Sequence, residues 1–99
     1  VVSYQDPSWP SSASSWLKEV PWGINRNLVW IKNHYGNPPV LITENGWSDT
    51  GELEDNGRVD YYRNYLYEIL KAIHEDGCNV IGYTAWSLMD NFEWMSGYT

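Results

Sequence analysis

Two short apolar segments separated by a helical pattern constrain the fold of this chain more than any other feature. Residues 40–43 form the first segment, and the chain turns abruptly polar at Glu44. Residues 78–85 form the second, and a cluster of aromatic and polar side chains follows it. Short runs rich in β-branched residues are typical of strands that are buried on both faces. The sequence therefore predicts two buried strands, at residues 40–44 and 78–86, with polar or aromatic side chains at their carboxyl ends.

Helical patterns precede both predicted strands. Residues 21–35 begin with a proline, which suits the first position of a helix, and stop before Gly36. Residues 58–76 repeat apolar side chains at helical spacing and follow a capping residue, Asp55 or Asn56. The side chains predicted to be buried are Ile24, Leu28, Ile31 and Tyr35 in the first helix and Val59, Tyr62, Leu66, Ile69, Leu70 and Ile73 in the second.

The order of these segments predicts a parallel βαβ arrangement, with an ordered loop over residues 1–20 and another loop over residues 87–99. Two strands joined by a helix in one sheet form a right-handed parallel unit, and ligands bind at the carboxyl ends of such strands. No G-x-G-x-x-G pattern follows either strand, which disfavours a dinucleotide-binding fold. Two strands leave unpaired edges, and a closed barrel needs ~250 residues. Residues 1–99 are therefore predicted to be part of a larger α/β domain, not a complete domain.

Composition and charge exclude several function classes. The chain has 13 Asp and Glu residues against 6 Lys and Arg residues, a formal net charge of −7. This charge argues against nucleic acids and anionic membranes as partners, because both favour basic surfaces. No apolar run is long enough for a membrane span, and no signal peptide is visible. The single cysteine, Cys78, excludes an internal disulfide, and no metal-ligand or cofactor motif is found, so neither a metal nor a cofactor is expected.

Three residues after the predicted strands are candidates for chemistry, and each has a structural alternative. Glu44 is placed to act as a nucleophile or general base, or it caps a turn at residues 45–46. Glu93 is suited to binding sugar hydroxyls, or it is an ordinary exposed charge. Trp86 is either a stacking platform or a core side chain. The chain carries 7 Trp, 8 Tyr and 1 Phe, and such flat rings with a polar edge suit carbohydrate as well as a core.

The sequence around these candidates resembles glycoside hydrolase family 1. The resemblance rests on residues 42–46, Ile-Thr-Glu-Asn-Gly, followed by residues 86–94, Trp-Ser-Leu-Met-Asp-Asn-Phe-Glu-Trp. Residues 6–9, 14–17 and 20–23 look like those of the animal members, among them insect digestive enzymes. The resemblance runs along the whole chain, and this pair of motifs is far more specific than one short motif.

The resemblance implies a retaining β-glycosidase on a (β/α)8 TIM barrel, of which this chain would form strands seven and eight with helices six and seven. Glu44 matches the nucleophile of the family, and a covalent glycosyl-enzyme intermediate would form on it. By similarity, Trp86 would stack on the sugar ring, Glu93 would accept from its 4- and 6-hydroxyls, and Trp94 would donate its indole N–H. The expected activity is that of a β-glucosidase acting on terminal β-D-glucosyl, galactosyl or fucosyl residues. The acid/base motif of the family, of the T-x-N-E-P type, is absent from these residues, so the chain alone is predicted to be inactive.

Two variants of this function stay open at this point. A klotho-like binding module would use the barrel without catalysis, although such relatives lack the glutamate found at position 44. A myrosinase-type thioglucosidase would keep the nucleophile and replace the acid/base. The expected partners are a small neutral β-glucoside, such as a cellobiose-like or aryl glucoside, and the remainder of the barrel. The compartment is not determined, with a lean toward secretion from the resemblance to digestive enzymes.

Overall fold

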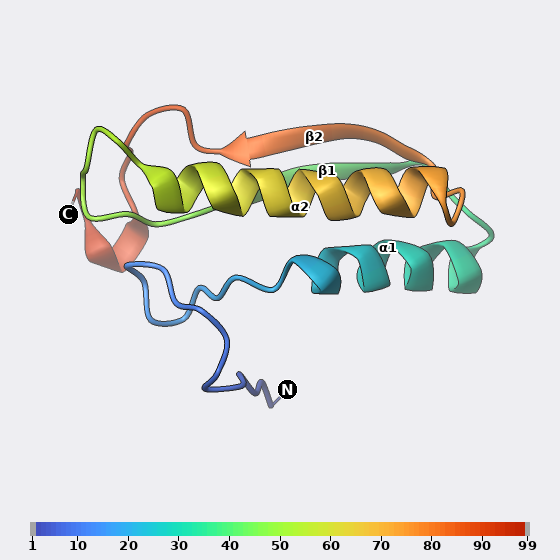
Figure 1. The fold of residues 1–99 in the computed structure, drawn as a ribbon, viewed down its shortest axis with the longest axis horizontal. Coiled ribbons are helices and arrows are strands. Elements are labelled where there is room, and N and C mark those ends of the chain that lie inside the picture. Colours follow the sequence, from blue (N-terminus) through green and yellow to red (C-terminus); the bar gives the residue numbers. More distant parts are fainter. Residues whose placement is uncertain (1, 99) are drawn as a thin grey trace.

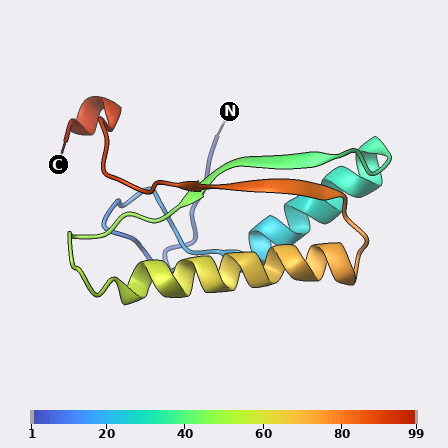
Figure 2. The same cartoon turned by 90° about the horizontal axis from the view of Figure 1, so that it is seen from above.

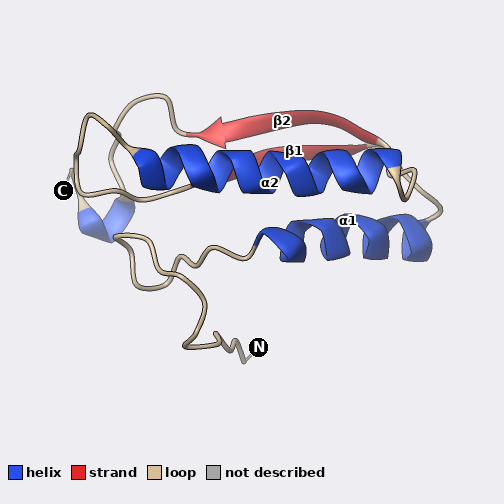
Figure 3. Cartoon of the chain, in the orientation of Figure 1, coloured by secondary structure: helices blue, strands red, loops and turns tan. Residues whose placement is uncertain are grey.

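The computed structural model describes residues 2–98, and within them helices and strands alternate along the chain (Figures 1 and 3). Residues 1 and 99, the ends of the two predicted loops, lie outside the described residues. The elements are α1 (Pro21–Tyr35), β1 (Val40–Gly46), α2 (Asn56–His74), β2 (Val80–Trp86) and a short 3-10 helix, η1 (Trp94–Ser96). Within the described residues no helix is long and apolar enough to cross a membrane.

The two strands form a parallel sheet that the helices cover on one side. Figure 1 shows α1 and α2 running alongside each other, and Figure 2 shows α2 and the strands as separate layers. The buried core lies where these layers meet. Its fully buried members come from both helices and from Cys78, just before β2. Partly buried side chains of the strands pack on them. The core residues are Leu28, Ile69, Ala72 and Cys78, with Val40, Ile42, Val80 and Tyr83 from the strand side.

Within residues 2–98 the helices cover one face of the strands, and the predicted burial of both faces stays a prediction for the complete barrel. Val40 and Ile42 pack toward the helices, whereas Leu41 is 54% exposed and Ile81 is 65% exposed. The physical reason is that both helices lie on the same side of the sheet, so that nothing within residues 2–98 covers the other face. Apolar side chains on both faces of a strand are typical of a parallel sheet with a second layer.

The pairing of the strands contains two irregularities of one residue each. Between the first two pairs β2 has one extra residue, and between Ile42 and Asn45 β1 has one extra residue. The two insertions compensate, and the strands end level with each other. The paired residues are Val40–Val80, Leu41–Gly82, Ile42–Tyr83, Asn45–Ala85 and Gly46–Trp86. The last two pairs extend β1 beyond the predicted end at residue 44.

The buried stripe of α2 differs from the predicted one. Of the six predicted residues only Ile69 is fully buried, while Val59, Leu66 and Leu70 are 40–52% exposed. The buried positions are Tyr61, Tyr65, Ile69 and Ala72. The stripe is rotated because two tyrosines whose hydroxyls find polar partners take the buried positions: Tyr61 bonds to Asn45 at the end of β1, and Tyr65 bonds to Val20 before α1.

Helix ends follow the capping residues of the sequence. Gly36 adopts a left-handed conformation with φ 72° and ends α1 at Tyr35. The Asp55 side chain accepts a hydrogen bond from the Arg58 backbone N–H at 3.1 Å, so α2 begins at Asn56, two residues before the predicted start at 58. The helix ends at His74 and not at 76, because the chain turns through Gly77 with φ 66°.

The start of β2 and the long loops also differ in detail from the prediction. Residues 78–79 bond to the end of α2 and to Asn37, so β2 begins at Val80 and not at 78. The predicted loop 87–99 contains η1. The segment 2–20 is irregular, with an isolated antiparallel bridge between Ser11 and Lys18. Its end is tied to α2, because the Val20 N–H donates to the Tyr65 hydroxyl at 2.8 Å.

Candidate active site

A cavity of about 1300 Å³ lies at the carboxyl ends of the two strands. All four residues that the sequence singles out line it: Glu44 from β1, Trp86 from the end of β2, and Glu93 and Trp94 from the loop that follows. The segment 13–17 and the loop after β1 complete its wall. The structure therefore brings the four residues to one hollow, as parallel strands with level ends require.

The β1 irregularity sets the direction of Glu44. Two residues of β1, Thr43 and Glu44, stand opposite the single residue Thr84 of β2. Such a bulge breaks the alternation of side chains along a strand. Thr43 and Glu44 are both exposed, whereas the residues on either side of them, Ile42 and Asn45, are partly buried against the helix layer. The extra residue thus leaves Glu44 on the open side of the sheet.

Trp86 and Glu93 face each other across the turn that follows β2. The indole N–H of Trp86 donates to Oε1 of Glu93 at 3.1 Å, and the Trp86 ring remains 43% exposed. The peptide bond between Trp86 and Ser87 is cis. Local bonds fold the turn, since Ser87 Oγ donates to the Met89 carbonyl at 2.7 Å and Asn91 Nδ2 donates to Ser87 Oγ at 3.1 Å. A carboxylate beside an exposed indole face is an arrangement suited to a polyhydroxylated ring.

Trp94 begins η1 and lies at the rim of the cavity. Its backbone is left-handed with φ 47°, and its side chain is 83% exposed. The Glu93 N–H donates to the Gly97 carbonyl at 2.7 Å, and the Gly97 N–H donates back to the Trp94 carbonyl at 3.1 Å. These bonds close a compact turn that presents Glu93 and Trp94 side by side.

A cluster of three tyrosines, Tyr61, Tyr62 and Tyr83, lies where the strand ends meet α2, and sequence reasoning missed it. Asn45 Nδ2 donates to the Tyr61 hydroxyl at 2.9 Å, and the Tyr83 hydroxyl donates to Asn45 Oδ1 at 2.7 Å. The Tyr62 hydroxyl donates to the Trp86 carbonyl at 3.1 Å. The available signal was the spacing of Tyr61, Tyr65 and Ile69, which is helical.

Burial keeps the hydroxyls of this tyrosine cluster protonated. Desolvation raises the pKa of Tyr83 to about 12, and it raises the pKa of Tyr61 and Tyr62 above their usual value as well. The three hydroxyls are therefore neutral at ordinary pH. Tyr83 and Tyr62 thus keep the protons that they donate to Asn45 Oδ1 and to the Trp86 carbonyl, and the Tyr61 hydroxyl accepts from Asn45 Nδ2.

An arginine ties the loop after β1 to α2. Arg58 pairs with Asp49 at 2.7 Å and with Asp55 at 2.9 Å, and it donates to the Trp47 carbonyl at 3.3 Å. The two carboxyl groups also contact each other. The hydrogen bond from Asp55 lowers the pKa of Asp49, and the same contact raises the pKa of Asp55. The ordered loop forms one wall of the cavity.

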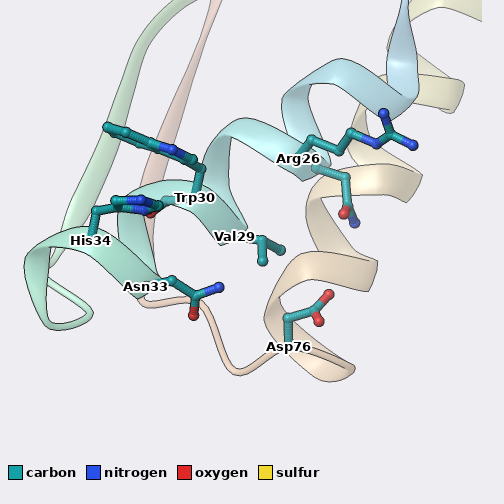
Figure 4. A pocket seen from close by; sticks show the side chains of 7 residues that line it. Arg26, Val29, Trp30, Asn33, His34 and Asp76 are labelled. Atoms are coloured by element: carbon teal, nitrogen blue, oxygen red, sulfur yellow. The ribbon is translucent and has the colours of Figure 1, made fainter.

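A second hollow, of about 360 Å³, lies beside α1 and is separate from the four predicted residues. Figure 4 shows the Trp30 ring over the His34 imidazole, with Asp76 approaching from the segment after α2. The two rings are stacked with centroids 4.1 Å apart. Within residues 2–98 no group of His, Cys, Asp or Glu side chains is arranged to hold a metal ion.

Comparison with known proteins agrees with the motif resemblance. A family model described as Glycosyl hydrolase family 1 matches residues 1–99. Myrosinase 1 of Brevicoryne brassicae is 50% identical over 99 residues, which cover 99% of this chain and 21% of that protein. Lactase/phlorizin hydrolase of Rattus norvegicus is 52% identical over 100 residues, which cover 99% of this chain and 5% of that protein.

Solved structures give the same result for the fold. The rice Os3BGlu6 β-glucosidase superposes with a TM-score of 0.88 at 40% identity, covering 94% of this chain and 21% of that one. An aphid myrosinase superposes with a TM-score of 0.85 at 49% identity, covering 94% of this chain and 20% of that one. The chain thus spans about a fifth of the length of these relatives.

Proposed function

Because residues 1–99 belong to glycosyl hydrolase family 1, we propose that they carry the nucleophile and the sugar-binding end of a retaining β-glucosidase. The chain has the α/β fold of part of the TIM barrel found in its structural relatives, and that family is one of glycoside hydrolases. The finer points proposed here are the role of each residue and the preference for β-D-glucosides. The observation that carries the proposal is the bulge that leaves Glu44 facing a cavity shared with Trp86 and Glu93.

In the proposed first step, a carboxylate oxygen of Glu44 attacks the anomeric carbon of the substrate. The bond from that carbon to the glycosidic oxygen breaks, and a second carboxyl group, ~5–5.5 Å from the first in retaining enzymes, protonates the leaving oxygen. The resemblance assigns this second group to a T-x-N-E-P-type motif, which is not found among residues 1–99. Water then hydrolyses the glycosyl–Glu44 ester, and the second carboxylate accepts its proton.

The other three residues bind the sugar in this proposal. The exposed face of Trp86 covers the apolar face of the ring, and the Glu93 carboxylate accepts from its 4- and 6-hydroxyls. The Trp94 indole N–H donates to a further hydroxyl. An anionic Glu93 disfavours a 6-phosphorylated sugar through like-charge repulsion, so a neutral glycone is expected.

Covalent trapping tests the proposal. The complete enzyme that contains residues 1–99 is treated with an activated 2-deoxy-2-fluoro-β-glucoside and digested, and the labelled peptide is identified by mass spectrometry. We expect the label on Glu44 and none on the Glu44→Gln variant, with Glu54→Gln, outside the cavity, labelling as the unmodified enzyme does. A label on any other residue contradicts the assignment.

The similarity to Myrosinase 1 and to the aphid myrosinase structure makes thioglucoside hydrolysis the second candidate function. A matched pair of substrates that differ only in an oxygen or sulfur leaving atom separates the two. A β-glucosidase hydrolyses the O-glucoside faster, and a myrosinase-type enzyme hydrolyses the S-glucoside faster. A klotho-like binding module would bind without turning over either substrate, and the presence of Glu44 argues against it.

A further inference from the structure

The residue after the proposed nucleophile is held more tightly than the nucleophile itself. The Asn45 amide is bound on both sides, since it donates to the Tyr61 hydroxyl at 2.9 Å and accepts from the Tyr83 hydroxyl at 2.7 Å. These partners come from different elements, α2 and β2. Tyr61 is only 2% exposed, so its hydroxyl is fixed by packing. The side chain of Asn45 therefore links the end of β1 to two neighbouring elements at once.

This link lies immediately after the bulge at residues 43–44. A bulge leaves one residue without a partner in the ladder, so the ladder alone does not fix which residue is the extra one. A slip of one residue reverses the face to which each side chain points. If the strand slipped here, Glu44 would turn toward the helix layer and the Asn45 amide would turn away from the hydroxyls of Tyr61 and Tyr83. The Asn45 amide makes both hydrogen bonds only with the observed pairing, in which Thr43 and Glu44 together stand opposite Thr84. This pairing is the phase of the bulge.

The end of β2 is fixed against the same point. The Tyr62 hydroxyl donates to the Trp86 carbonyl, and Gly46 approaches that carbonyl so closely that a Cβ at position 46 would lie 1.8 Å from its oxygen. The phase of the bulge thus determines the position of Glu44 relative to Trp86. A displacement near 1 Å between reacting groups can cost about 100-fold in rate.

We propose that Asn45 is a positioning residue, which through the hydroxyls of Tyr61 and Tyr83 holds the bulge in the one phase that directs Glu44 into the cavity. This inference rests on the proposed function of Glu44 as the nucleophile. Asn45 does not touch the substrate in this proposal. Its role is to make the geometry of attack reproducible, and its loss slows bond formation more than it weakens binding.

Single hydroxyl deletions in the complete enzyme test the inference. Tyr83→Phe and Tyr61→Phe each remove one bond to Asn45 and keep the aromatic ring, and Asn45→Ala removes both. Tyr65→Phe is the matched control: Tyr65 is 7% exposed on the same helix, and its hydroxyl bonds to Val20 and not to Asn45. Phenylalanine keeps the ring that stacks on Tyr61 with centroids 4.1 Å apart. The readouts are the first-order rate of 2-fluoroglucoside labelling at saturation, its half-saturation concentration, and kcat and KM with an aryl β-glucoside, with thermal stability measured beside them.

We expect Tyr83→Phe to lower the saturating labelling rate and kcat about ten-fold, with KM and half-saturation within about two-fold of the unmodified enzyme. Asn45→Ala lowers the rate further, and Tyr65→Phe loses thermal stability while keeping its rate. The inference is overturned if the Tyr83→Phe and Tyr61→Phe enzymes label at the unmodified rate, or if Tyr65→Phe slows labelling equally. If Asn45→Ala does not fold, the two Phe variants decide.

The same experiment separates this inference from the one on which it rests. If the unmodified enzyme is labelled on a residue other than Glu44, the proposed function fails. If Glu44 is labelled and the hydroxyl deletions have no effect on the rate, the proposed function stands and the positioning role of Asn45 is wrong.

Discussion

The two strand ends that meet at the cavity are held in different ways. At the end of β1, the tyrosine cluster and Asn45 connect residues that lie far apart in the sequence, so the position of Glu44 depends on α2 and β2. At the end of β2, Glu93 and Trp94 are held by short-range bonds within residues 86–97. The proposed nucleophile thus lies on a strand held by long-range hydrogen bonds, and the proposed sugar-binding residues lie on a loop held by its own short-range bonds. This difference is expected if the reaction demands more geometric precision than binding.

The largest expected effect separates the two carboxylates. Glu44→Gln removes the proposed nucleophile and is expected to lower kcat by about 10⁴-fold or more. Glu93→Gln removes the proposed charge-assisted hydrogen bonds to sugar hydroxyls and is expected to lower kcat/KM by about 10- to 100-fold. Steady-state kinetics with an aryl β-glucoside measures both. Equal losses for the two variants would contradict the proposal that Glu44 takes part in bond formation and Glu93 in sugar binding.

The next prediction tests the close contact between the ends of β1 and β2, where Gly46 approaches the Trp86 carbonyl. Gly46→Ala places a Cβ 1.8 Å from the Trp86 carbonyl oxygen, so the backbones must separate, and we expect a loss of about 3 kcal/mol or more in unfolding free energy. Gly23→Ala is the control, because its Cβ meets only the Val20 side chain, with Cγ1 at 3.5 Å and Cβ at 3.9 Å, which are ordinary contacts. Thermal melts of both variants in the complete enzyme are the measurement. A Gly46→Ala enzyme as stable as the control would show that the backbones at Gly46 and Trp86 can separate at little cost in unfolding free energy.

The smallest effect concerns the loop after β1, residues 47–55, and it depends on pH. Arg58→Gln leaves Asp49 and Asp55 in contact without their cation, and we expect a loss of about 1 kcal/mol at about pH 7. The contact with Asp49 already raises the pKa of Asp55 in the unmodified chain, and loss of the Arg58 cation raises it further. The loss therefore grows as pH rises through the range in which Asp55 ionises, and shrinks toward about pH 4.

The control for the loop prediction is Arg63→Gln. Arg63 pairs with Asp60 at 3.3 Å, and both side chains are more than 60% exposed, so little change is expected at either pH. Melting temperatures of the two variants at both pH values give the comparison. A pH-independent difference between the variants would indicate lost packing of the Arg58 side chain, not lost charge.

The sequence predicts the order of the elements because its signals are local. Pro21, Gly36 and the Asp55 cap act within one helical turn, and the structure shows each of them in that role. The grouping of Glu44, Trp86 and Glu93 also follows from position alone, since the ends of parallel strands lie at one edge of the sheet. Their chemical roles came from the resemblance and stay proposals.

The features that could not be predicted depend on contacts between distant residues. The bulge at residues 43–44 has no local signature, because only the pairing with β2 defines which residue is extra. The rotated face of α2 could not be predicted because a stripe through Tyr62 fits the helical spacing as well as one through Tyr61. Only packing in the fold buries the Tyr61 ring and brings its hydroxyl to Asn45. Likewise, nothing in the spacing of Asp49, Asp55 and Arg58 says that one guanidinium binds both carboxyls.

The two compensating insertions in the strands restrict how this segment can be exchanged. Ile81 is the surplus residue of β2 near its start, and β1 has its own surplus near its end, so the pair is matched in length only when both are present. A chimera that takes one strand from a homologue of regular pairing would move Gly46 out of line with Trp86. Chimeras between homologues should therefore exchange residues 40–86 as a whole.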